Sequence, residues 1–317
     1  MKLRDTVDAY LAYKRALGMR MESEGSMLHF LCRTLGDCDL AEVSTDAVTA
    51  FILVRGGLTS TSKQKTSVLR SFYRFATGRG FVESAPLPKI EPLYPPTRQP
   101  YIYTAEEIKA LLQATRQLDA PLVPLRAVTA RTLLLLLYGT GVRIGEALSL
   151  SLQDVEIANA LITVRNTKFF KSRYVPVGEK LTRHLAEYVE IRRRVLPTPA
   201  GESSAFFANR MGCRWSLSWV EALFCRLRLA AGIGRDCPRD RQPRIHDLRH
   251  TMVQHRLLAW YRTGADVQRL LPQLATYLGH VDISSTQHYL PMTAELLHEA
   301  NIRFQAYAQP ENFHAQP

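Results

Sequence analysis

Apolar residues recur at helical spacing through the first 85 residues of the chain. The repeating positions in three segments are Val7, Tyr10, Leu11 and Leu17, then Met27, Phe30, Leu31 and Leu35, then Val48, Phe51, Ile52 and Val54. A fourth segment, TSTSKQKTSVLRSFYRFATGRG, repeats the pattern and stops at Gly78 and Gly80. Spacings of three and four residues predict amphipathic helices that bury one face. Residues 1–85 are therefore expected to form an all-α domain.

The next segment, PLPKIEPLYPPTRQP, is rich in proline. It contains six prolines, and proline favours extended chain over helix. We expect residues 86–101 to be a semi-rigid linker. Just beyond it, Thr104 and Glu107 form a capping-box pattern that predicts the start of a helix. A second domain is expected at 102–308, followed by a tail at 309–317.

The second domain combines helical patterns with one strand-rich stretch. LITVR (161–165) and RYVPV (173–177) are short β-branched runs that predict an antiparallel hairpin. Helices are expected at about 179–195, 216–232 and 246–262, and in a last amphipathic segment, TAELLHEANIRFQAYA. The predicted fold class is mainly α: an all-α N-terminal domain, then an α+β domain that is mostly helical with a small antiparallel sheet.

The charge balance points to a polyanionic partner. The formal net charge is +12, and nucleic acid is the first candidate for such an excess, although a basic surface also serves solubility. On the fourth helical segment, basic residues occupy the face away from the apolar residues: Lys63, Lys65, Arg70 and Arg74. We take these four as candidate contacts to DNA phosphates. The alternative is an ordinary solvated helix face.

Other sequence signals exclude several classes. The five cysteines show no CxxC spacing, which gives neither a disulfide framework nor a zinc site and fits reduced thiols in a cytosolic protein. The N-terminal residues lack the apolar stretch of a signal peptide, and the longest apolar run, LLLLLY, is too short to span a bilayer. No metal-spaced carboxylate cluster and no Walker A motif occurs. We expect a soluble, cytoplasmic protein with no metal and no membrane partner.

Two clusters in the first half of the second domain carry groups suited to phosphate chemistry. In GTGVRIGEALSL (139–150), two glycines predict a tight turn into a helix, with Arg143 at its mouth. Glu146 lies one turn further on the same face and is placed to hold that arginine. In TKFFKSRYVPV, Lys168 and Lys171 fall in the hairpin loop. Each cluster alone has a plainer interpretation, as a surface ion pair or as ordinary turn residues.

Two further clusters follow near the C-terminus. RIHDLRHT (244–251) places His246 and Arg249 three residues apart, on one helical face. YLGHVDISSTQHYL (277–290) contains His280 and, nine residues later, Tyr289 in a polar run where a core tyrosine is not expected. A lone histidine–arginine pair is a common surface feature, so only the combination of clusters is informative.

Together, these groups suit phosphoryl transfer through a phosphotyrosine. Two arginines can bind the non-bridging oxygens of one phosphodiester and stabilise its pentacoordinate transition state. A tyrosine phenol has a pKa of about 10, so it ionises more easily than serine and leaves again readily. A histidine can accept the tyrosine proton or hold a phosphate oxygen, and a lysine can protonate the leaving sugar oxygen.

In their order along the chain, these motifs resemble those of the tyrosine recombinase, or phage integrase, family. The residues that carry the resemblance are Arg143, Lys168, HDLRH (246–250), LGH (278–280) and Tyr289. In addition, TSVLRSFYRFA resembles the family's helical, SAM-like core-binding domain, and YTAEEIKALLQA resembles the start of its catalytic domain. The resemblance therefore covers the chain end to end.

The resemblance implies a role for each residue. Arg143 and Arg249 would clamp the scissile phosphate that Tyr289 attacks. The other implied roles are His246 assisting the tyrosine proton, His280 binding a phosphate oxygen, Lys168 acting as general acid, and Glu146 buttressing Arg143.

The resemblance also implies how the protein would work on DNA. The family forms a 3′-phosphotyrosyl link, releases a 5′-hydroxyl, exchanges strands through a Holliday junction and needs no cofactor. Its two domains close around double-stranded DNA, and four protomers assemble on two sites, with a C-terminal helix, here about 292–307, docking on a neighbour. The implied location is the cytoplasm, at the nucleoid. A second recombinase or a DNA-bending protein stays open as a further partner.

Two features depart from the family pattern. AWYRTGADVQRLLPQLATYLGH looks longer than the usual link between HDLRH and LGH, with LPQLAT as extra chain, and this resembles transposon-borne members. The loop TKFFKSR lacks the usual glycine beside the lysine. The general acid is therefore open between Lys168 and Lys171, and the alignment of SRYVPV favours Lys168.

Two alternatives remain beside a recombinase. A type IB topoisomerase-like enzyme would use similar residues, but the N-terminal domain and the chain length argue against it. A catalytically silent DNA-binding accessory protein belongs to a different class, and the presence of all six catalytic residues argues against it. The DNA target, and whether the reaction integrates, excises, resolves or inverts, stay open.

Overall fold

The computed structural model describes residues 1–53, 58–88, 94, 98–118, 125–165, 172–196, 201, 203–235, 237–238, 241–279 and 293–307. The chain divides into two compact units, and the first of them ends at Arg98. The second unit comprises the other described residues. Each unit has its own hydrophobic core.

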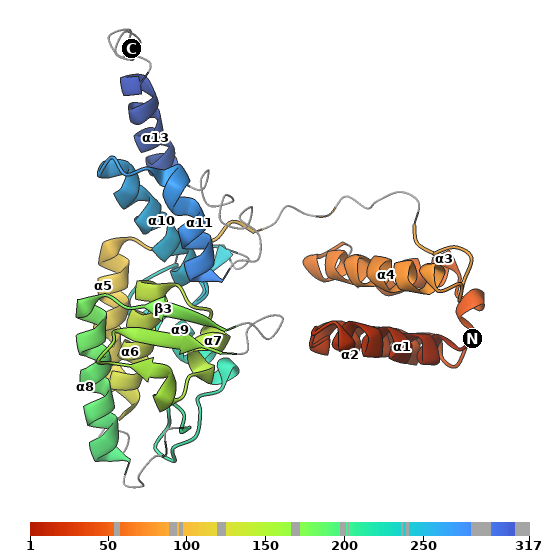
Figure 1. The fold of residues 1–317 in the computed structure, drawn as a ribbon, viewed down its shortest axis with the longest axis horizontal. Coiled ribbons are helices and arrows are strands. Elements are labelled where there is room, and N and C mark those ends of the chain that lie inside the picture. The colour runs from red at the N-terminus through yellow and green to blue at the C-terminus, as the bar shows by residue number, and fades with distance from the viewer. Residues whose placement is uncertain are drawn as a thin grey trace. The chain divides into compact units, whose positions relative to one another are not determined.

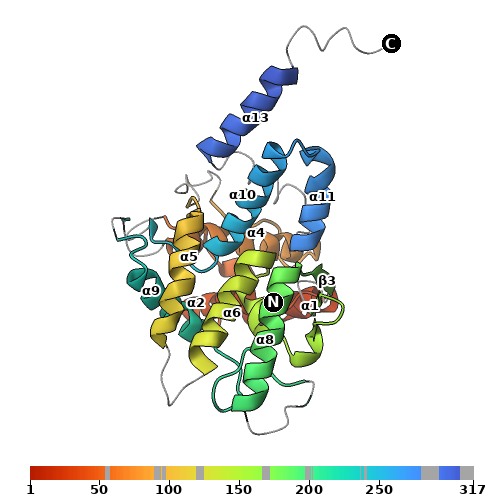
Figure 2. The same ribbon diagram turned by 90° about the vertical axis from the view of Figure 1, so that its left-hand side faces the viewer.

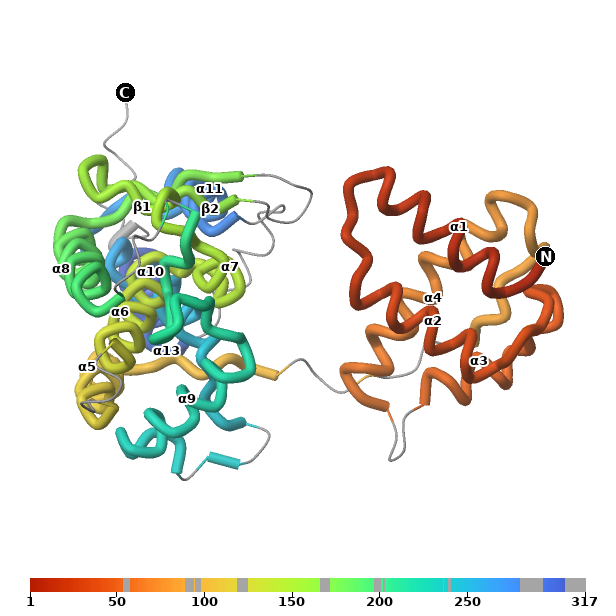
Figure 3. Tube along the Cα trace, turned by 90° about the horizontal axis from the view of Figure 1, so that it is seen from below, coloured from red at the N-terminus to blue at the C-terminus, as the bar shows by residue number. Residues whose placement is uncertain are grey.

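The first unit is all helical. Its helices are α1 (Leu3–Ala16), α2 (Glu22–Leu35), α3 (Thr45–Ile52) and α4 (Ser60–Gly78), with a short 3-10 turn at Leu40–Glu42 (Figure 1). Figure 3 traces the same helices as a tube. On α4, Phe72 and Tyr73 are fully buried, and the Tyr10 hydroxyl donates to Ser71 at 2.8 Å. The amphipathic pattern therefore buries the predicted face of α4.

Two apolar positions of the predicted pattern are not in this core. Leu17 is 55% exposed because α1 ends at Ala16. Phe30 is 49% exposed, and its ring lies against Phe51 at the surface. Helical spacing alone does not show where a helix ends or how wide its buried stripe is. Val54 lies outside the described residues.

The second unit is built from helices around a three-stranded sheet. The strands are β1 (Val155–Glu156), β2 (Leu161–Val164) and β3 (Arg173–Pro176), antiparallel in the order β1-β2-β3. Ile162 pairs with Val175 in the predicted hairpin. Strand β1 is only two residues long, and no pattern in the sequence predicted it.

Three long helices lie side by side beside this sheet: α5 (Ala105–Ala114), α6 (Leu125–Thr140) and α8 (Glu179–Val195) (Figure 2). Buried side chains from the strands and from these helices form one core. Thr104 and Glu107 make the predicted capping box at the start of α5. The predicted fold class, mainly α with a small antiparallel sheet, is confirmed.

The remaining helices complete the second unit. They are α7 (Ile144–Ser149), α9 (Leu217–Ala230), α10 (Asp247–Arg262), α11 (Val267–Leu278) and α13 (Ala294–Tyr307). The segment LPQLAT, expected as extra chain, forms the middle of α11 and includes Pro272. Among the described helices, none is long and apolar enough to cross a membrane.

Helix α13 packs on α10 of its own chain. Leu296 is buried in the core that α10 and α11 share. Arg262 on α10 pairs with Glu295 and, at 3.2 Å, with Glu299. Arg303 donates to the carbonyls of Gly264 and Ala265 just after α10. The apolar side chains of α13 that stay exposed are Leu297, Ile302 and Phe304.

Candidate functional site

Arg143 occupies the N-cap position of α7. Its backbone N–H donates to Oε2 of Glu146 at 3.0 Å, and its Nη1 donates to Oε1 at 2.9 Å. The Arg143 side chain is still 42% exposed. The predicted arrangement, an arginine held by the glutamate one turn on, is therefore present. One detail was wrong: Gly139 belongs to α6, so only Gly141 lies in the turn.

Arg249 lies on α10 and is buried, at 3% exposure. Its Nη1 donates to the carbonyl of Gly141, and its Nη2 donates to the carbonyl of Leu278 at 2.9 Å. Arg143 Nη2 lies 3.4 Å from the carbonyl oxygen of the next residue, Gly279. The two predicted arginines, 106 positions apart in the sequence, thus meet at the end of α11.

Two glycines make this close approach possible. Gly141 has a φ of +65°, and a Cβ atom there would lie 2.3 Å from Met252 on α10. Gly279 has a φ of +67° and forms the left-handed C-cap of α11. A side chain at either position would strain the backbone, and it would displace Met252 at Gly141 or the Arg173 guanidinium at Gly279. The GTG and LGH motifs therefore bring α7, α10 and α11 together.

His246 lies at the N-cap of α10, next to Arg249. The fully buried Asp247 accepts the Arg244 backbone N–H at 2.8 Å and closes the turn that leads into α10. Although part of the His246 side chain is open to solvent, desolvation lowers the pKa of its ring, and the charge of Arg249 lowers it further. Both effects favour the neutral ring, which is able to accept a proton.

Glu146 has a second partner that the sequence analysis missed. Arg173, the first residue of β3, donates from Nη2 to Oε2 at 2.7 Å and from Nη1 to Oε1 at 3.1 Å. Burial alone would raise the pKa of Glu146, but hydrogen bonds and charge from Arg173, and then from Arg143, lower it to about 2. Glu146 is therefore a fixed anion between two arginines.

Four predicted residues fall outside the described part of the chain: Lys168, its alternative Lys171, His280 and Tyr289. The neighbouring Tyr277 is described, and it packs before the Gly279 turn. Its hydroxyl donates to the Pro176 carbonyl at 3.2 Å, and burial raises its pKa to about 12. Within the described ranges, no group of three or more His, Cys, Asp or Glu side chains could hold a metal ion.

The four basic residues predicted on α4 do not share one face. Lys63, Arg70 and Arg74 are exposed and line a hollow of about 350 Å³ together with Tyr94. Lys65 instead donates to the Phe51 carbonyl, and its ammonium lies 4.2 Å from the centre of the Phe51 ring. Lys65 therefore serves packing between α3 and α4.

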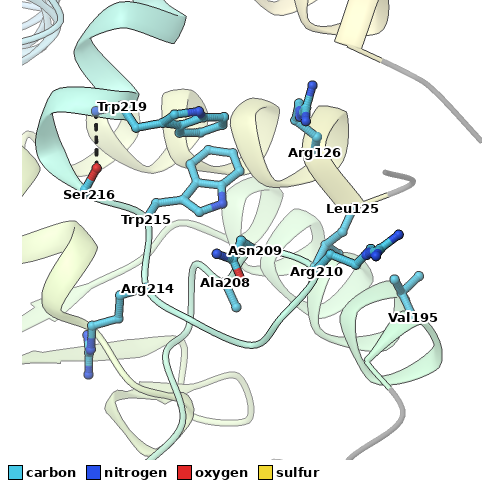
Figure 4. A pocket seen from close by; sticks show the side chains of 10 residues that line it. All are labelled: Leu125, Arg126, Val195, Ala208, Asn209, Arg210, Arg214, Trp215, Ser216 and Trp219. Carbon is cyan, nitrogen blue, oxygen red and sulfur yellow. Dashed lines mark hydrogen bonds between the residues drawn. The ribbon is translucent and has the colours of Figure 1, made fainter. Parts of the chain in front are cut away.

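A pocket of about 330 Å³ lies elsewhere in the second unit, between the start of α6, the end of α8 and the start of α9 (Figure 4). Trp215 and Trp219 contact each other edge to face in its wall. Arg214 turns away from the two indoles and donates to the carbonyls of Leu148 and Leu150 at the end of α7. No residue that lines this pocket belongs to the predicted site.

The comparison with protein families agrees with this geometry. Residues 102–295 match the phage integrase family, and they include every predicted catalytic residue. The chain belongs to the phage integrase family. The expectation of a tyrosine-type, site-specific DNA recombinase is thereby confirmed.

Relatives extend the match over most of the chain. A putative integrase/recombinase, y4rB, from Sinorhizobium fredii is 32% identical over 95% of this chain and 96% of its own length. The tyrosine recombinase XerC from Oceanobacillus iheyensis is 32% identical over 76% of this chain and 72% of its own length.

Solved structures show the same fold. The Tn1549 transposon integrase, in complex with a circular intermediate DNA, aligns with a TM-score of 0.71 and 15% identity over 96% of this chain and 99% of its own. A lambda integrase tetramer bound to a Holliday junction aligns with a TM-score of 0.64 and 18% identity, over 91% of this chain and 77% of its own.

Proposed function

We propose that this recombinase cleaves and rejoins double-stranded DNA through a 3′-phosphotyrosine formed on Tyr289. The observation that carries the proposal is the meeting of Arg143 and Arg249 at the end of α11, with His246 beside Arg249. Two guanidinium groups held by backbone carbonyls and by a carboxylate are preorganised donors for one phosphate.

Each step of the reaction then has a residue. Arg143 and Arg249 bind the non-bridging oxygens of the scissile phosphate, where His280 also binds. The Tyr289 oxygen bonds to phosphorus while its proton passes to His246. The bond from phosphorus to the 5′ oxygen breaks, and Lys168 protonates that oxygen; Lys171 is the alternative donor. Attack by a 5′-hydroxyl of the partner strand reverses these steps, rejoins the DNA and leads to a Holliday junction.

The two units have separate roles in this proposal. Residues 1–85 form a core-binding domain that contacts DNA through the exposed basic side chains of α4, and residues 102–308 form the catalytic domain. Residues 86–101 link the two, and residues 309–317 are a tail. Lys63, Arg70 and Arg74 share one hollow and are the DNA contacts we retain. Lys65 supports α4 on Phe51.

We further propose that the active form is a tetramer on two DNA sites. The lambda integrase in the Holliday-junction structure is a tetramer. In the present chain, Leu297 and Phe304 on α13 are 52% and 67% exposed and lie seven residues apart, on one face of the helix, which we assign to a neighbouring protomer. Action at the nucleoid in the cytoplasm, residence on a mobile element, and help from a second recombinase or a DNA-bending protein belong to the same proposal.

Capture of covalent adducts tests this proposal and identifies the DNA target in the same experiment. The protein is expressed in cells that carry its native locus and isolated under denaturing conditions, and the DNA that stays attached is sequenced. Tyr289→Phe removes the proposed nucleophile, and Tyr277→Phe is the matched control because Tyr277 packs against Pro176. Wild type and Tyr277→Phe should both yield adducts at one site, and Tyr289→Phe should yield none.

Other outcomes would overturn the proposal in distinct ways. Equal adducts from wild type and Tyr289→Phe would mean that another residue is the nucleophile. Specific DNA binding with no adduct from any form would indicate a silent accessory protein. Scattered adducts, together with relaxation of supercoiled DNA that lacks the site, would indicate a topoisomerase-like enzyme.

A further inference from the structure

Arg173 occupies a junction of three elements. It begins β3, its guanidinium group holds Glu146 near the start of α7, and its Nε donates to the Tyr277 carbonyl near the end of α11 at 3.1 Å. The side chain is only 12% exposed. A Cβ atom on Gly279 would lie 2.8 Å from its Nη1, so the C-cap of α11 rests directly on this guanidinium group.

Glu146 is saturated by its two arginines. Oε1 accepts from Nη1 of both Arg143 and Arg173, and Oε2 accepts from the Arg143 backbone N–H and from Arg173 Nη2. A carboxylate has about four lone-pair sites, and all are used here. The two arginines therefore fix the orientation of the Glu146 carboxylate. Arg143 is in turn held by a carboxylate that cannot rotate.

Arg173 also changes the charge that a bound phosphate would meet. A pair of Arg143 and Glu146 alone would be neutral, so the carboxylate would offset much of the attraction of Arg143 for a phosphate. With Arg173 the cluster carries a net positive charge. Arg173 neutralises the Glu146 carboxylate. The positive charge on the exposed part of Arg143 is then available to attract the phosphate.

We infer that Arg173 is a positioning residue for DNA cleavage, which acts through Glu146 on Arg143 and through the Tyr277 carbonyl on the end of α11. This inference rests on the proposed function. Arg173 touches no reacting atom in this scheme, and its effect is on the rate of the chemical step more than on DNA affinity.

The test uses single-turnover adduct formation on the captured DNA fragment. Arg173→Gln removes the charge, and Arg173→Lys keeps the charge without the bidentate geometry. The matched control is Arg165→Gln on the same hairpin, because Arg165 pairs with Asp154 at 2.5 Å, apart from the Glu146 cluster. Circular dichroism melting and DNA affinity are measured for every variant.

At saturating DNA, Arg173→Gln should cleave about 10- to 100-fold more slowly, as expected for the loss of a group that orients a functional residue. Arg173→Lys should recover part of that loss. Arg165→Gln should cleave at the wild-type rate. All forms should bind DNA with similar affinity.

A pH profile separates positioning from general stability. The groups that face Glu146 are Arg143 on its own helix and Arg173 on β3, while α11 offers the Tyr277 and Gly279 carbonyls to these arginines. Without the hydrogen bonds and charge of Arg173, the pKa of Glu146 rises above its wild-type value, although Arg143 still lowers it. Cleavage by Arg173→Gln should therefore acquire an extra fall toward acid pH. The Arg173→Gln, Glu146→Gln double variant should lack this fall.

The outcomes are distinguishable. If wild type forms no adduct, the proposed function fails and this inference fails with it. If wild type cleaves and Arg173→Gln matches it in rate and pH profile, only the inference fails. A rate loss in Arg173→Gln that Arg165→Gln reproduces, without the extra acid limb, would reduce Arg173 to a structural residue.

Discussion

Basic side chains gather in two regions of this chain, around the end of α11 and along α4, and their surroundings differ. At α11, Arg249 is 3% exposed and bound to two backbone carbonyls, and Arg143 is braced by Glu146. On α4, Lys63, Arg70 and Arg74 are exposed on the wall of an open hollow. The first region is organised for chemistry on one phosphate, whereas the second offers charge to a DNA backbone.

Catalysis on a phosphate and attraction of a DNA backbone place different requirements on basic side chains. Stabilising a transition state needs donors fixed before the substrate arrives, and fixing them takes long-range partners such as Gly141 and Leu278. Attracting a DNA backbone needs charge within reach of phosphates and tolerates mobile side chains. Substitutions near the end of α11 should therefore change the cleavage rate, whereas substitutions on α4 should change the salt-dependent affinity for DNA.

The largest effect should come from Arg249→Lys. Lysine keeps the charge but cannot bridge the Gly141 and Leu278 carbonyls while presenting donors to a phosphate. We expect adduct formation to slow by about 10³-fold at saturating DNA, with affinity little changed. Single-turnover cleavage and a binding titration on the same fragment measure both quantities, and a loss confined to affinity would contradict the comparison.

His246→Gln should follow, with a loss of at least about 10²-fold, the lower range for a general base. Burial and Arg249 lower the pKa of His246, so the neutral form persists to a more acidic pH than for a free histidine. The wild-type rate should therefore fall only below pH 6.5, as pH drops through the lowered pKa. The pH–rate profile of the variant should lack this fall in rate at acid pH. If the fall persists in the variant, a group other than His246 causes it.

Glu146→Gln should slow cleavage about 10- to 100-fold and lower the melting temperature, because Arg143 and Arg173 then face each other without an anion. The pKa of Glu146 falls from 4.5 to about 2 on folding. Its ionic contribution to stability is present above pH 4.5 and is lost as pH falls toward 2. Melting of wild type and variant across this range should show a gap that closes in acid; a gap independent of pH would show that charge is not its source.

The smallest effect on rate should come from α4. Arg70→Gln with Arg74→Gln should leave cleavage at saturating DNA unchanged and lower the slope of log affinity against log salt by about 2. Lys65→Gln is the contrasting variant: it should lower the melting temperature and leave the salt slope unchanged, because Lys65 supports Phe51. If Lys65→Gln also lowers the slope of log affinity against log salt, Lys65 contacts DNA after all.

Local patterns predicted much of the fold and of the site. Periodicity predicted the helices of the first unit, and β-branched runs predicted the β2–β3 hairpin. The Arg143–Glu146 contact follows from a spacing of three residues. Helix geometry could also have separated Lys65 from Lys63. Residues two positions apart on a helix point about 200° away from each other.

The long-range contacts were not predictable in this way. The sequence pattern predicted Arg173 only as the first residue of a strand. Nothing near it in the sequence indicated that its side chain contacts Glu146 and the Tyr277 carbonyl. The Arg249–Gly141 contact joins positions 108 apart. Segment LPQLAT was expected to be extra chain because the link to LGH looked long, but it forms the middle of α11, with Pro272 inside the helix.

Substrate charge offers the most direct test of the central claim, that Arg143 and Arg249 act on one phosphate. The captured site is synthesised with a methylphosphonate, which lacks the negative charge, at the cleaved position or at a neighbouring one. Arg249→Ala, inactive on ordinary DNA, should form adducts on the DNA modified at the cleaved position only, whereas the α4 variants should gain nothing from either substitution. Failure to restore Arg249→Ala at the cleaved position, or equal restoration at its neighbour, would contradict the account.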